Sequence, residues 1–226
     1  MDVDKDLRID KRTIRYWEHG IKTVYKWRDP EWYKEAATRY SGMEMLRPYF
    51  ADMIDGKRKL KIADLGTGAF VQIGNYWPSA IVEIYPMDYI ADEYMEYLKS
   101  IGIEPVYQIE KQDMENLTYE DNFFDIVHCS NALDHCLNPK KALTEMIRVC
   151  KSQGWIYLRH MPNNARKLHY GGLHQWNIDY MKGDCLFWTK DRATTFKLSE
   201  VGDFRSTVKK DIPEMRSAYC ISVMQK

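Results

Sequence analysis

The sequence predicts an α/β fold built on a doubly wound, mostly parallel sheet. Short β-prone segments alternate with helical segments through the middle of the chain, and polar residues follow each of these strands. Two closely spaced glycines also follow the first strand. Alternating strands and helices form parallel sheets, whose ligands bind at the carboxyl ends of the strands. The polar residues therefore predict a ligand site along that edge.

The first predicted strand begins at Lys59 and stops at Asp64, and Gly66, Thr67 and Gly68 form the turn that follows. Glycine tolerates positive φ and has no Cβ, so this turn lets the backbone come close to a ligand. A glycine turn at this place in an open α/β sheet binds nucleotide-like cofactors. Asp64 has a second interpretation, in which its carboxylate only fixes the turn.

The second predicted strand covers residues 80–85, and Asp88 follows it. About 20 residues after a glycine turn, a carboxylate is placed to accept hydrogen bonds from both ribose hydroxyls. The next helix carries an apolar face between Ile90 and Ile101 and ends at Gly102.

The third and fourth predicted strands cover residues 105–109 and 123–129. Asp113 follows the third strand and has two interpretations, a ligand contact or the cap of a short turn. Asn138 and Pro139 then form a typical helix start, an N-cap followed by proline in the first turn. Gly154 is predicted to break the chain before a fifth strand, and a hairpin over 177–190 and a last strand at 218–223 follow.

Four blocks in this order resemble the class I S-adenosylmethionine-dependent methyltransferases. These blocks are Asp64-Leu65-Gly66-Thr67-Gly68, Met87-Asp88, Gln112-Asp113-Met114 and Phe123-Phe124-Asp125-Ile126-Val127. The resemblance extends from residue 61 to 159. It implies a Rossmann-like, seven-stranded sheet with an antiparallel last strand, S-adenosyl-L-methionine as cofactor and S-adenosyl-L-homocysteine as product.

The resemblance also implies roles for single residues. The glycine turn backs the methionine moiety, Asp88 holds the ribose, and Asp113 lies beside the adenine. Phe70 stands where many members have a third glycine, which reshapes the turn without excluding the cofactor. The complete set of expected cofactor contacts is Asp64, Gly66, Thr67, Gly68, Asp88, Tyr89, Asp113, Met114, Ser130 and Asn131.

The acceptor side is predicted in the loop 160–178, which follows the fifth strand. Trp176 is suited to stack on a sugar face, while Gln175, Asn177 and His160 are suited to bind hydroxyls. A packed loop that only fixes the corner of the sheet is the alternative. The block around His174 resembles a bacterial subgroup associated with surface glycans, which implies a role in polysaccharide biosynthesis.

Methyl transfer to a hydroxyl requires in-line alignment and a base, and histidine is the natural base near neutral pH. His135, after the fourth strand, is the first candidate, His174 the second and His160 the third, with Asp134 as orienting group or base. Convergence of these four side chains on a metal is the alternative, but no local metal-binding spacing is present, so no metal is predicted. His128, inside the fourth strand, is expected to be structural.

Composition and length limit the other possibilities. Lysine plus arginine equals aspartate plus glutamate, 33 each, so the absence of a basic field argues against nucleic-acid binding. Five cysteines without Cys-x-x-Cys spacing indicate unpaired thiols and a reducing compartment. No membrane span or signal peptide is predicted, so the protein is expected to be cytoplasmic; self-association stays open.

The predicted organisation is an N-terminal helical cap or lid, 1–58, and a cofactor-binding core, 59–226. The predicted function is methyl transfer to a small polar acceptor, chiefly a hydroxyl of a sugar, sugar nucleotide or surface-polysaccharide precursor. One alternative is a nitrogen or phosphorus-linked acceptor, and another is a catalytically inactive partner protein. A dinucleotide oxidoreductase is disfavoured because Val71 stands where the third fingerprint glycine is expected.

Overall fold

The computed structural model describes most of the chain after residue 58. The described ranges are 59–69, 71, 73–74, 77, 79–105, 107–171, 173–209 and 218–226, together with Arg15, His19 and Ile54. These three isolated residues are helical. Apart from them, the predicted cap, 1–58, lies outside the described residues, as does Phe70.

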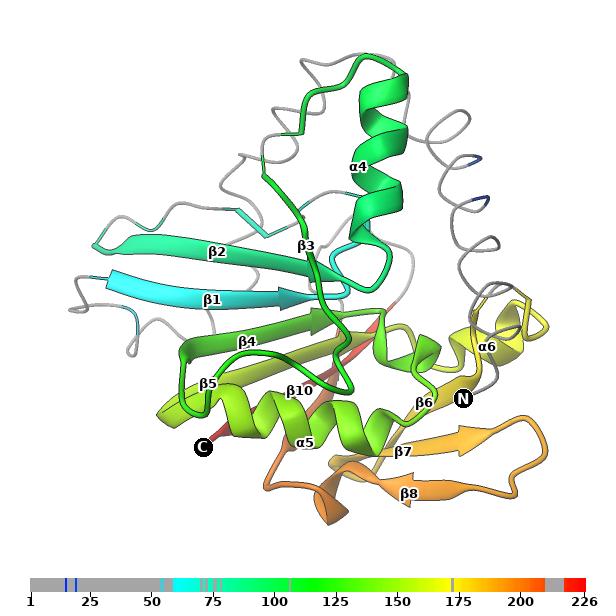
Figure 1. Ribbon diagram of the computed structural model, residues 1–226. Helices are drawn as coiled ribbons and strands as arrows, with labels where there is room; N and C mark the ends of the chain where they lie inside the picture. Colours follow the sequence, from blue (N-terminus) through cyan, green and yellow to red (C-terminus); the bar gives the residue numbers. More distant parts are fainter. Residues whose placement is uncertain are drawn as a thin grey trace.

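A seven-stranded sheet forms the centre of the described part, in the order β3-β2-β1-β4-β5-β10-β9 (Figure 1). Its strands are β1 (Lys59–Leu65), β2 (Ile81–Asp88), β3 (Glu110–Lys111), β4 (Phe124–Ser130), β5 (Cys150–His160), β9 (Arg205–Lys209) and β10 (Tyr219–Gln225). β1 to β5 pair in parallel, whereas β10 is antiparallel to both β5 and β9. The predicted sheet is confirmed, and its strand order reverses between β1 and β4, where ligands of such sheets bind.

The helices begin and end at the predicted signals. α4 (Ala91–Ser100) is followed by Gly102, whose φ is +77°. α5 (Pro139–Val149) starts with Asn138, whose side-chain oxygen accepts a hydrogen bond from the Lys141 backbone N–H at 3.2 Å. The described residues after β1 also form α6 (Asn164–Lys167) and two 3-10 turns, η1 (Leu133–His135) and η2 (Leu198–Glu200).

Both faces of the central sheet are buried, as is typical of parallel strands. On one face, Leu143 and Met146 of α5 pack in the same core as Leu65 and Val127 of the sheet. On the other face, strand residues and residues outside the strands form a second core. Its strand members are Leu60, Ile62, Ile126 and Tyr157, and the others are Ile54, Val71, Ile73 and Trp77. The alternation of side chains along β1 and β4 therefore supplies two cores from the same strands.

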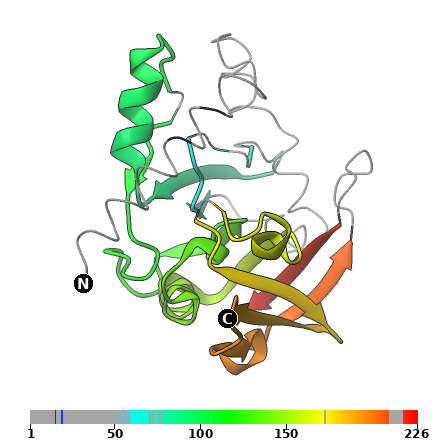
Figure 2. The same cartoon turned by 90° about the vertical axis from the view of Figure 1, so that its right-hand side faces the viewer.

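A second, three-stranded antiparallel sheet follows β5 in the chain. It consists of β6 (Trp176–Met181), β7 (Asp184–Thr189) and β8 (Thr195–Lys197). The β6–β7 turn places Lys182 and Gly183 at φ +49° and +88°, as a two-residue hairpin of type I′ requires. This confirms the predicted hairpin, which lies beside β9 and β10 (Figure 2).

Two strand predictions are wrong. Residues 105–109 form no strand in their described part, and only Glu110 and Lys111 pair with the end of β2. Pro105 has no backbone N–H to donate, so this apolar segment did not form a ladder of hydrogen bonds with a neighbouring strand.

The predicted position of Gly154 is also wrong. Gly154 does not precede the fifth strand but lies inside β5, where the register with β4 shifts between Phe124 and Ile126. A Cβ at Gly154 would lie 2.8 Å from Cys150 Sγ, so the glycine permits this irregularity rather than ending the strand.

Two further expectations concern cysteines and membrane segments. All five cysteines are buried and free, which confirms the unpaired thiols. Among the described residues, no helix has both the length and the apolar character that a bilayer crossing needs.

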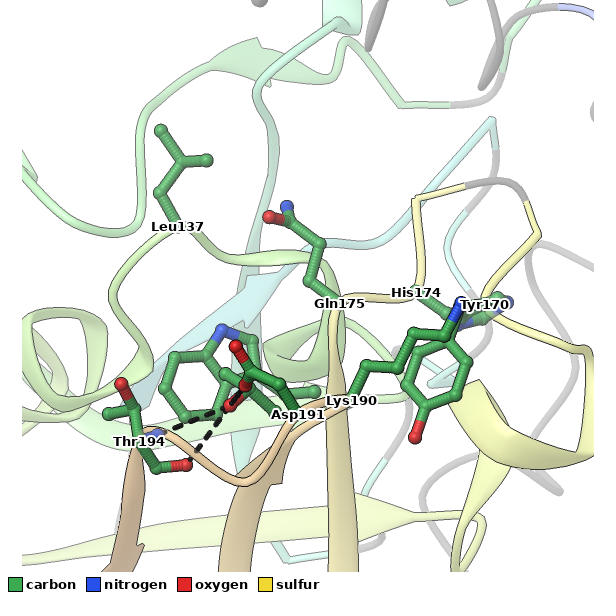
Figure 3. A pocket seen from close by; sticks show the side chains of 9 residues that line it. Leu137, Tyr170, His174, Gln175, Lys190, Asp191 and Thr194 are labelled. Carbon is green, nitrogen blue, oxygen red and sulfur yellow. Dashed lines mark hydrogen bonds between the residues drawn. The ribbon is translucent and has the colours of Figure 1, made fainter.

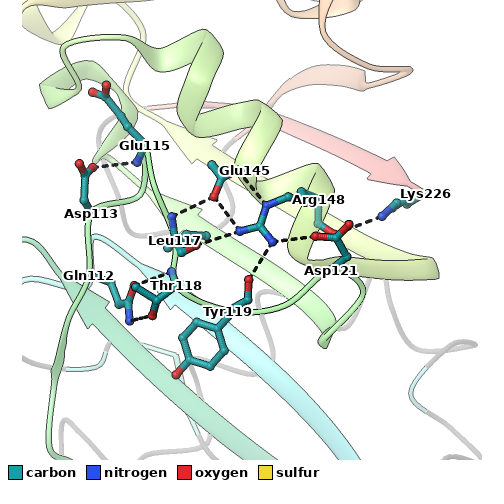
Figure 4. Close-up of polar contacts among 10 residues, drawn as sticks. All are labelled: Gln112, Asp113, Glu115, Leu117, Thr118, Tyr119, Asp121, Glu145, Arg148 and Lys226. Carbon is teal, nitrogen blue, oxygen red and sulfur yellow. Dashed lines mark hydrogen bonds and ion pairs between the residues drawn. The ribbon is translucent and has the colours of Figure 1, made fainter.

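The segment between β3 and β4 is held in place by Arg148 of α5 (Figure 4). Its guanidinium donates to the carbonyl oxygens of Leu117 at 2.9 Å and Tyr119 at 2.7 Å. It also pairs with Glu145 at 2.7 Å and Asp121 at 2.8 Å. The hydrogen bonds that Arg148 donates to Glu145 and Asp121 raise its pKa, so this cation is a permanent anchor for the segment that follows Asp113.

Replacing Arg148 by methionine is expected to lower the free energy of unfolding by about 1–3 kcal/mol, because two backbone carbonyls and two carboxylates lose a charged donor. Urea denaturation measures the change. Lys140→Met is the matched control, because its pair with Glu200 at 2.9 Å is exposed, and it should cost less than about 0.5 kcal/mol. Equal losses in the two variants would contradict the anchoring role of Arg148.

Candidate active site

The glycine turn after β1 folds over the end of β2. Gly66 and Gly68 have φ of +67° and +73°. The backbone N–H groups of Gly66 and Thr67 both donate to the Met87 carbonyl oxygen, at 2.9 and 3.2 Å. A Cβ at Gly66 would lie only 2.2 Å from Ala132 Cβ. The turn therefore needs glycine for close packing against the segment after β4, a reason that the sequence did not reveal.

Gly66→Ala is expected to destabilise the fold by about 2–4 kcal/mol, because a positive φ and an overlap with Ala132 act together. Gly102→Ala is the control: its φ is +77°, but no atom lies within 4 Å of the added Cβ. It should cost only about 1 kcal/mol in urea denaturation. Adding Ala132→Gly should restore part of the loss at position 66 only, and a failure to do so would refute the steric explanation.

Asp64, at the end of β1, has both carboxylate oxygens engaged within the protein. Oδ1 lies 2.7 Å from His128 Nδ1, and Oδ2 accepts a hydrogen bond from Thr67 Oγ1 at 2.9 Å. Asp64 and His128 are both buried, and the His128 ring stacks on Tyr157. This geometry supports the second interpretation of Asp64, in which it fixes the turn, and it agrees with the structural role expected for His128.

Asp88 is the last residue of β2 and lies against the glycine turn. Its Oδ2 accepts a hydrogen bond from Gly68 N at 2.9 Å, across 20 positions of sequence, and its Oδ1 accepts one from Ile90 N at 3.2 Å. Burial raises the pKa of Asp88 to about 6, although these backbone donors oppose the shift. The structure thus brings together the two features that the sequence predicted for a nucleoside.

Three further predicted cofactor contacts, Asp113, Met114 and Tyr89, differ in how far their side chains are exposed to solvent. Asp113 is exposed, and its Oδ1 accepts a hydrogen bond from Glu115 N at 2.8 Å, the turn cap of its second interpretation. Met114 reaches the glycine turn, since its Cε lies 3.1 Å from the Cβ position of Gly66. Tyr89, after β2, is 44% exposed.

Asn131 and Ser130 connect the ends of β4 and β5. Asn131 has a φ of +52°; its backbone N–H donates to Arg159 O at 2.9 Å, and its side-chain oxygen accepts from Met161 N at 2.8 Å. Ser130 Oγ accepts a hydrogen bond from Arg159 Nη1 at 3.2 Å. Both residues lie at the strand order reversal, where the resemblance places them.

Beyond Asn131, a cluster of three side chains forms where η1 meets the loop before β6. His174 Nδ1 lies 2.5 Å from Asp134 Oδ2, across 40 positions of sequence, and 3.0 Å from His135 Nε2. The two imidazole rings meet edge to face, with centroids 4.5 Å apart. The structure therefore brings together the three predicted catalytic residues.

Hydrogen bonds to η1 hold the loop in this position. The backbone N–H of Gln175 donates to Asp134 O at 2.8 Å, and its side-chain amide donates to His135 O at 3.1 Å. The Trp176 indole N–H donates to Cys136 O at 3.0 Å. The two residues that follow His174 are thus fixed to η1 and to the residue after it, which orients the His174 ring toward Asp134.

The cluster has an unequal distribution of charge. Burial by itself would raise the pKa of Asp134, but His135, His174 and His160 together hold it below the usual range. Burial lowers the pKa of His135, against the attraction of Asp134. Burial also lowers the pKa of His160 to about 4. Near neutral pH an ionised Asp134 therefore lies beside the neutral imidazoles of His135 and His160.

An open cavity of about 860 Å³ adjoins His174 (Figure 3). Its lining residues are Leu137, Tyr170, His174, Gln175, Trp176, Thr189, Lys190, Asp191 and Thr194. Tyr170 lies in the predicted acceptor loop, whereas the sequence did not mark Lys190, Asp191 or Thr194, because only the pairing of β7 with β8 brings the 189–194 turn to this place.

The predicted acceptor residues differ in their availability. Gln175 lines the cavity; Trp176 also lines it, but is only 7% exposed and packs in the core. The Asn177 side chain is fully buried and bonded to Arg166 N and Tyr170 Oη, both at 2.8 Å. This geometry gives Asn177 a structural role, the orientation of Tyr170, in place of the predicted acceptor contact. His160 is buried at the end of β5 and does not line this cavity.

Comparisons with known proteins give one domain match and structures of similar fold. Residues 63–158 match the model of the methyltransferase domain family. A crystal structure of a S-adenosylmethionine-dependent methyltransferase from Clostridium acetobutylicum shares 12% identity, covers 93% of this chain and 97% of its own, and has a TM-score of 0.51. A 1,6-didemethyltoxoflavin-N1-methyltransferase from Burkholderia thailandensis, solved with bound 1,6-didemethyltoxoflavin and S-adenosylhomocysteine, shares 13% identity over 98% of this chain and 89% of its own, with a TM-score of 0.48. A search of curated protein sequences gave no significant match.

At such identities the structural similarity shows the fold alone, whereas the domain match specifies the class of protein. The matched segment contains the glycine turn, Asp88 and the β4 end described above. The protein is a S-adenosylmethionine-dependent methyltransferase with the class I fold. Its cofactor is S-adenosyl-L-methionine.

Proposed function

We propose that the protein transfers the methyl group of S-adenosylmethionine to a hydroxyl of a small polar acceptor, a sugar or surface-polysaccharide precursor. The observation that carries this proposal is the Asp134–His174 pair at the wall of an open cavity. Ala132, two residues before Asp134, packs on the glycine turn, so the pair lies close to the place where the methionine moiety is expected.

The cofactor is expected to span the strand order reversal between β1 and β4. Asp88 would accept hydrogen bonds from the ribose hydroxyls, and the turn with Gly66 and Gly68 would back the methionine moiety. Asp113 and Met114 would border the adenine. Asn131, which directly follows β4, would contact the cofactor at the carboxyl end of that strand. Residues 1–58 are proposed to cover this site as a lid.

The hydroxyl proton must leave as the methyl group arrives. In the proposed tautomer His174 Nδ1, which lies 2.5 Å from Asp134 Oδ2, donates to the carboxylate, so the other ring nitrogen, Nε2, is the basic one. In this assignment Nε2 accepts the proton, and Asp134 stabilises the imidazolium that forms. His135 supports the pair through its contact with His174 at 3.0 Å.

The lining of the cavity favours a polar acceptor of moderate size. Gln175, Thr194, Lys190 and Asp191 offer donors and acceptors, and Tyr170 adds an aromatic face. Lys190 Nζ lies 5.3 Å from the centre of the Tyr170 ring, so a cation and an aromatic face are presented together. Such a combination suits the hydroxyls and ring face of a sugar, with a phosphate as in nucleotide sugars. Together with five unpaired thiols, this acceptor favours a cytoplasmic reaction.

An acceptor screen with isotopically labelled S-adenosylmethionine tests the proposal. Free sugars, sugar phosphates and nucleotide sugars are compared with amino sugars, and NMR identifies the methylated atom. Lys190→Gln should raise KM for phosphate-bearing acceptors by about 10-fold, with Lys197→Gln, an exposed lysine in β8, as the control. A product methylated on nitrogen would refute the hydroxyl assignment. If S-adenosylmethionine binds but no acceptor is methylated, the inactive partner protein becomes the better interpretation.

A further inference from the structure

Three side chains with metal-binding atoms converge beside the cavity. Asp134, His135 and His174 each offer one such atom, and these atoms all lie within 4.8 Å of one another. The sequence predicts no metal here, because two of the residues adjoin each other and the third lies 39 positions beyond. The fold supplies the proximity that a local motif would supply elsewhere.

Hydrogen bonding satisfies the three atoms incompletely. His174 Nδ1 lies 2.5 Å from Asp134 Oδ2 and 3.0 Å from His135 Nε2. If Nδ1 carries the proton, that single N–H is shared between two acceptors. If Nδ1 is unprotonated, its lone pair is directed at a carboxylate. A cation bound by one atom of each residue would accept a lone pair from all three.

Two buried polar groups next to the cluster also have no hydrogen-bond partner among the described residues. One is Asp134 Oδ1, which lies 3.7 Å from His135 Nε2, too far for a hydrogen bond. The other is His160, which is 4% exposed and whose ring nitrogens are both without such a partner. Its ring lies close enough to Asp134 and His135 to interact electrostatically with both. Buried polar atoms are nearly always satisfied, so these groups point to a missing ligand.

We propose that Asp134, His135 and His174 bind a divalent first-row transition metal ion such as Zn²⁺. Two imidazoles and one carboxylate suit such ions, with bonds of about 2.0–2.2 Å. At the tetrahedral angle that Zn²⁺ prefers, ligand atoms are then about 3.3–3.6 Å apart, so the contacts of 2.5 and 3.0 Å would open slightly to admit the ion. Three protein ligands leave coordination positions open, as catalytic sites do. His160 is placed to interact with a water molecule on the ion.

The role of the ion rests on the proposed function. An acceptor hydroxyl in the cavity would take an open position, and the ion would lower its pKa. The proton passes to solvent, the alkoxide oxygen forms a bond to the methyl carbon, and the carbon–sulfur bond breaks to leave neutral S-adenosylhomocysteine. The ion replaces the proton shared by Asp134 and His174, so the histidine is a ligand in this form and not a base.

Titration of the chelator-treated protein with Co²⁺ tests the site by visible absorption. One equivalent of Co²⁺ should bind with the absorption of an imidazole-bound ion, and Zn²⁺ should displace it. Asp134→Asn and His135→Gln should each weaken binding at least about 10-fold. His169→Gln, an exposed histidine in the same loop, should leave it unchanged. Thermal melting checks that each variant is folded. His135→Gln should disturb the fold less than Asp134→Asn, because 34% of the His135 side chain is accessible to solvent.

The outcomes separate the metal site from the proposed function. No Co²⁺ absorption, or binding unaffected by both substitutions, would overturn the metal site even if sugar hydroxyls are methylated. Co²⁺ binding through these ligands without methylation of any hydroxyl would support the site and refute the proposed function. Full activity of the metal-free protein would overturn the catalytic role of the ion. Loss of activity on chelation, restored by Zn²⁺ or Co²⁺, would support both.

Discussion

Replacing His174 by alanine is expected to lower kcat by about 10²–10⁴-fold, the range that a positioned base contributes. His174 is the cluster residue that both contacts Asp134, at 2.5 Å, and lines the cavity. The affinity for S-adenosylmethionine should change by less than about twofold, a range below about 0.4 kcal/mol. Single-turnover methyl transfer, combined with calorimetric titration of the cofactor, measures the two quantities separately.

The control is His169→Ala, which removes an exposed imidazole from the same loop and should leave kcat unchanged. Added imidazole should restore part of the lost rate only in the His174 variant if the residue acts as a base. A loss of less than about tenfold, roughly 1.4 kcal/mol of barrier, would contradict an essential role for His174. His135→Ala should have the smaller effect, since His135 reaches the carboxylate mainly through His174.

Replacing Asp88 by alanine is expected to weaken S-adenosylmethionine binding by at least about 100-fold. Two hydrogen bonds from ribose hydroxyls to a carboxylate would be lost, each typically contributing about 1.5–3 kcal/mol. The Gly68 N–H would also lose its acceptor at 2.9 Å, which loosens the glycine turn. Calorimetric titration measures the affinity. Asp113→Ala is the matched control, because that carboxylate is exposed, and it should cost less than about tenfold.

The same carboxylate predicts how cofactor binding depends on pH. Burial raises the pKa of Asp88 to about 6 in the cofactor-free protein, and the ribose hydroxyls favour its ionised form. Binding therefore releases a proton below pH 6, so affinity should fall about tenfold per pH unit there and level off above it. Asp88→Asn should remove this dependence. An affinity that stays constant between pH 5 and 7 in the wild type would contradict the assignment of Asp88 as the ribose ligand.

Local sequence signals predicted the boundaries of several elements. Asn138 and Pro139 start α5, Gly102 follows α4, and Lys182 and Gly183 form the β6–β7 turn. Each of these depends on the conformational preference of one or two residues, so neighbours in the sequence are sufficient. Signals that depend on a partner strand were less reliable, as the single short pairing of β3 and the position of Gly154 inside β5 show.

The sequence by itself determined the class of the protein and the cofactor edge of its sheet. Residues that follow parallel strands share one edge whatever the details of packing, so the glycine turn and Asp88 were identified from their order and spacing. The tertiary structure decided which of these groups are engaged. Asp64 proved to be bonded to His128 and Thr67, and Asn177 to Tyr170.

Only the tertiary structure brought His174 to Asp134 and the 189–194 turn to the cavity. Contacts across 40 residues depend on how η1 docks against the β6 loop and on how the second sheet packs against β9 and β10. Hydrophobic periodicity and local spacing contain no information about such docking, because they report which face of an element is buried and not what lies against it. The nature of the cofactor could therefore be predicted from the sequence, whereas the geometry that surrounds the acceptor required the fold.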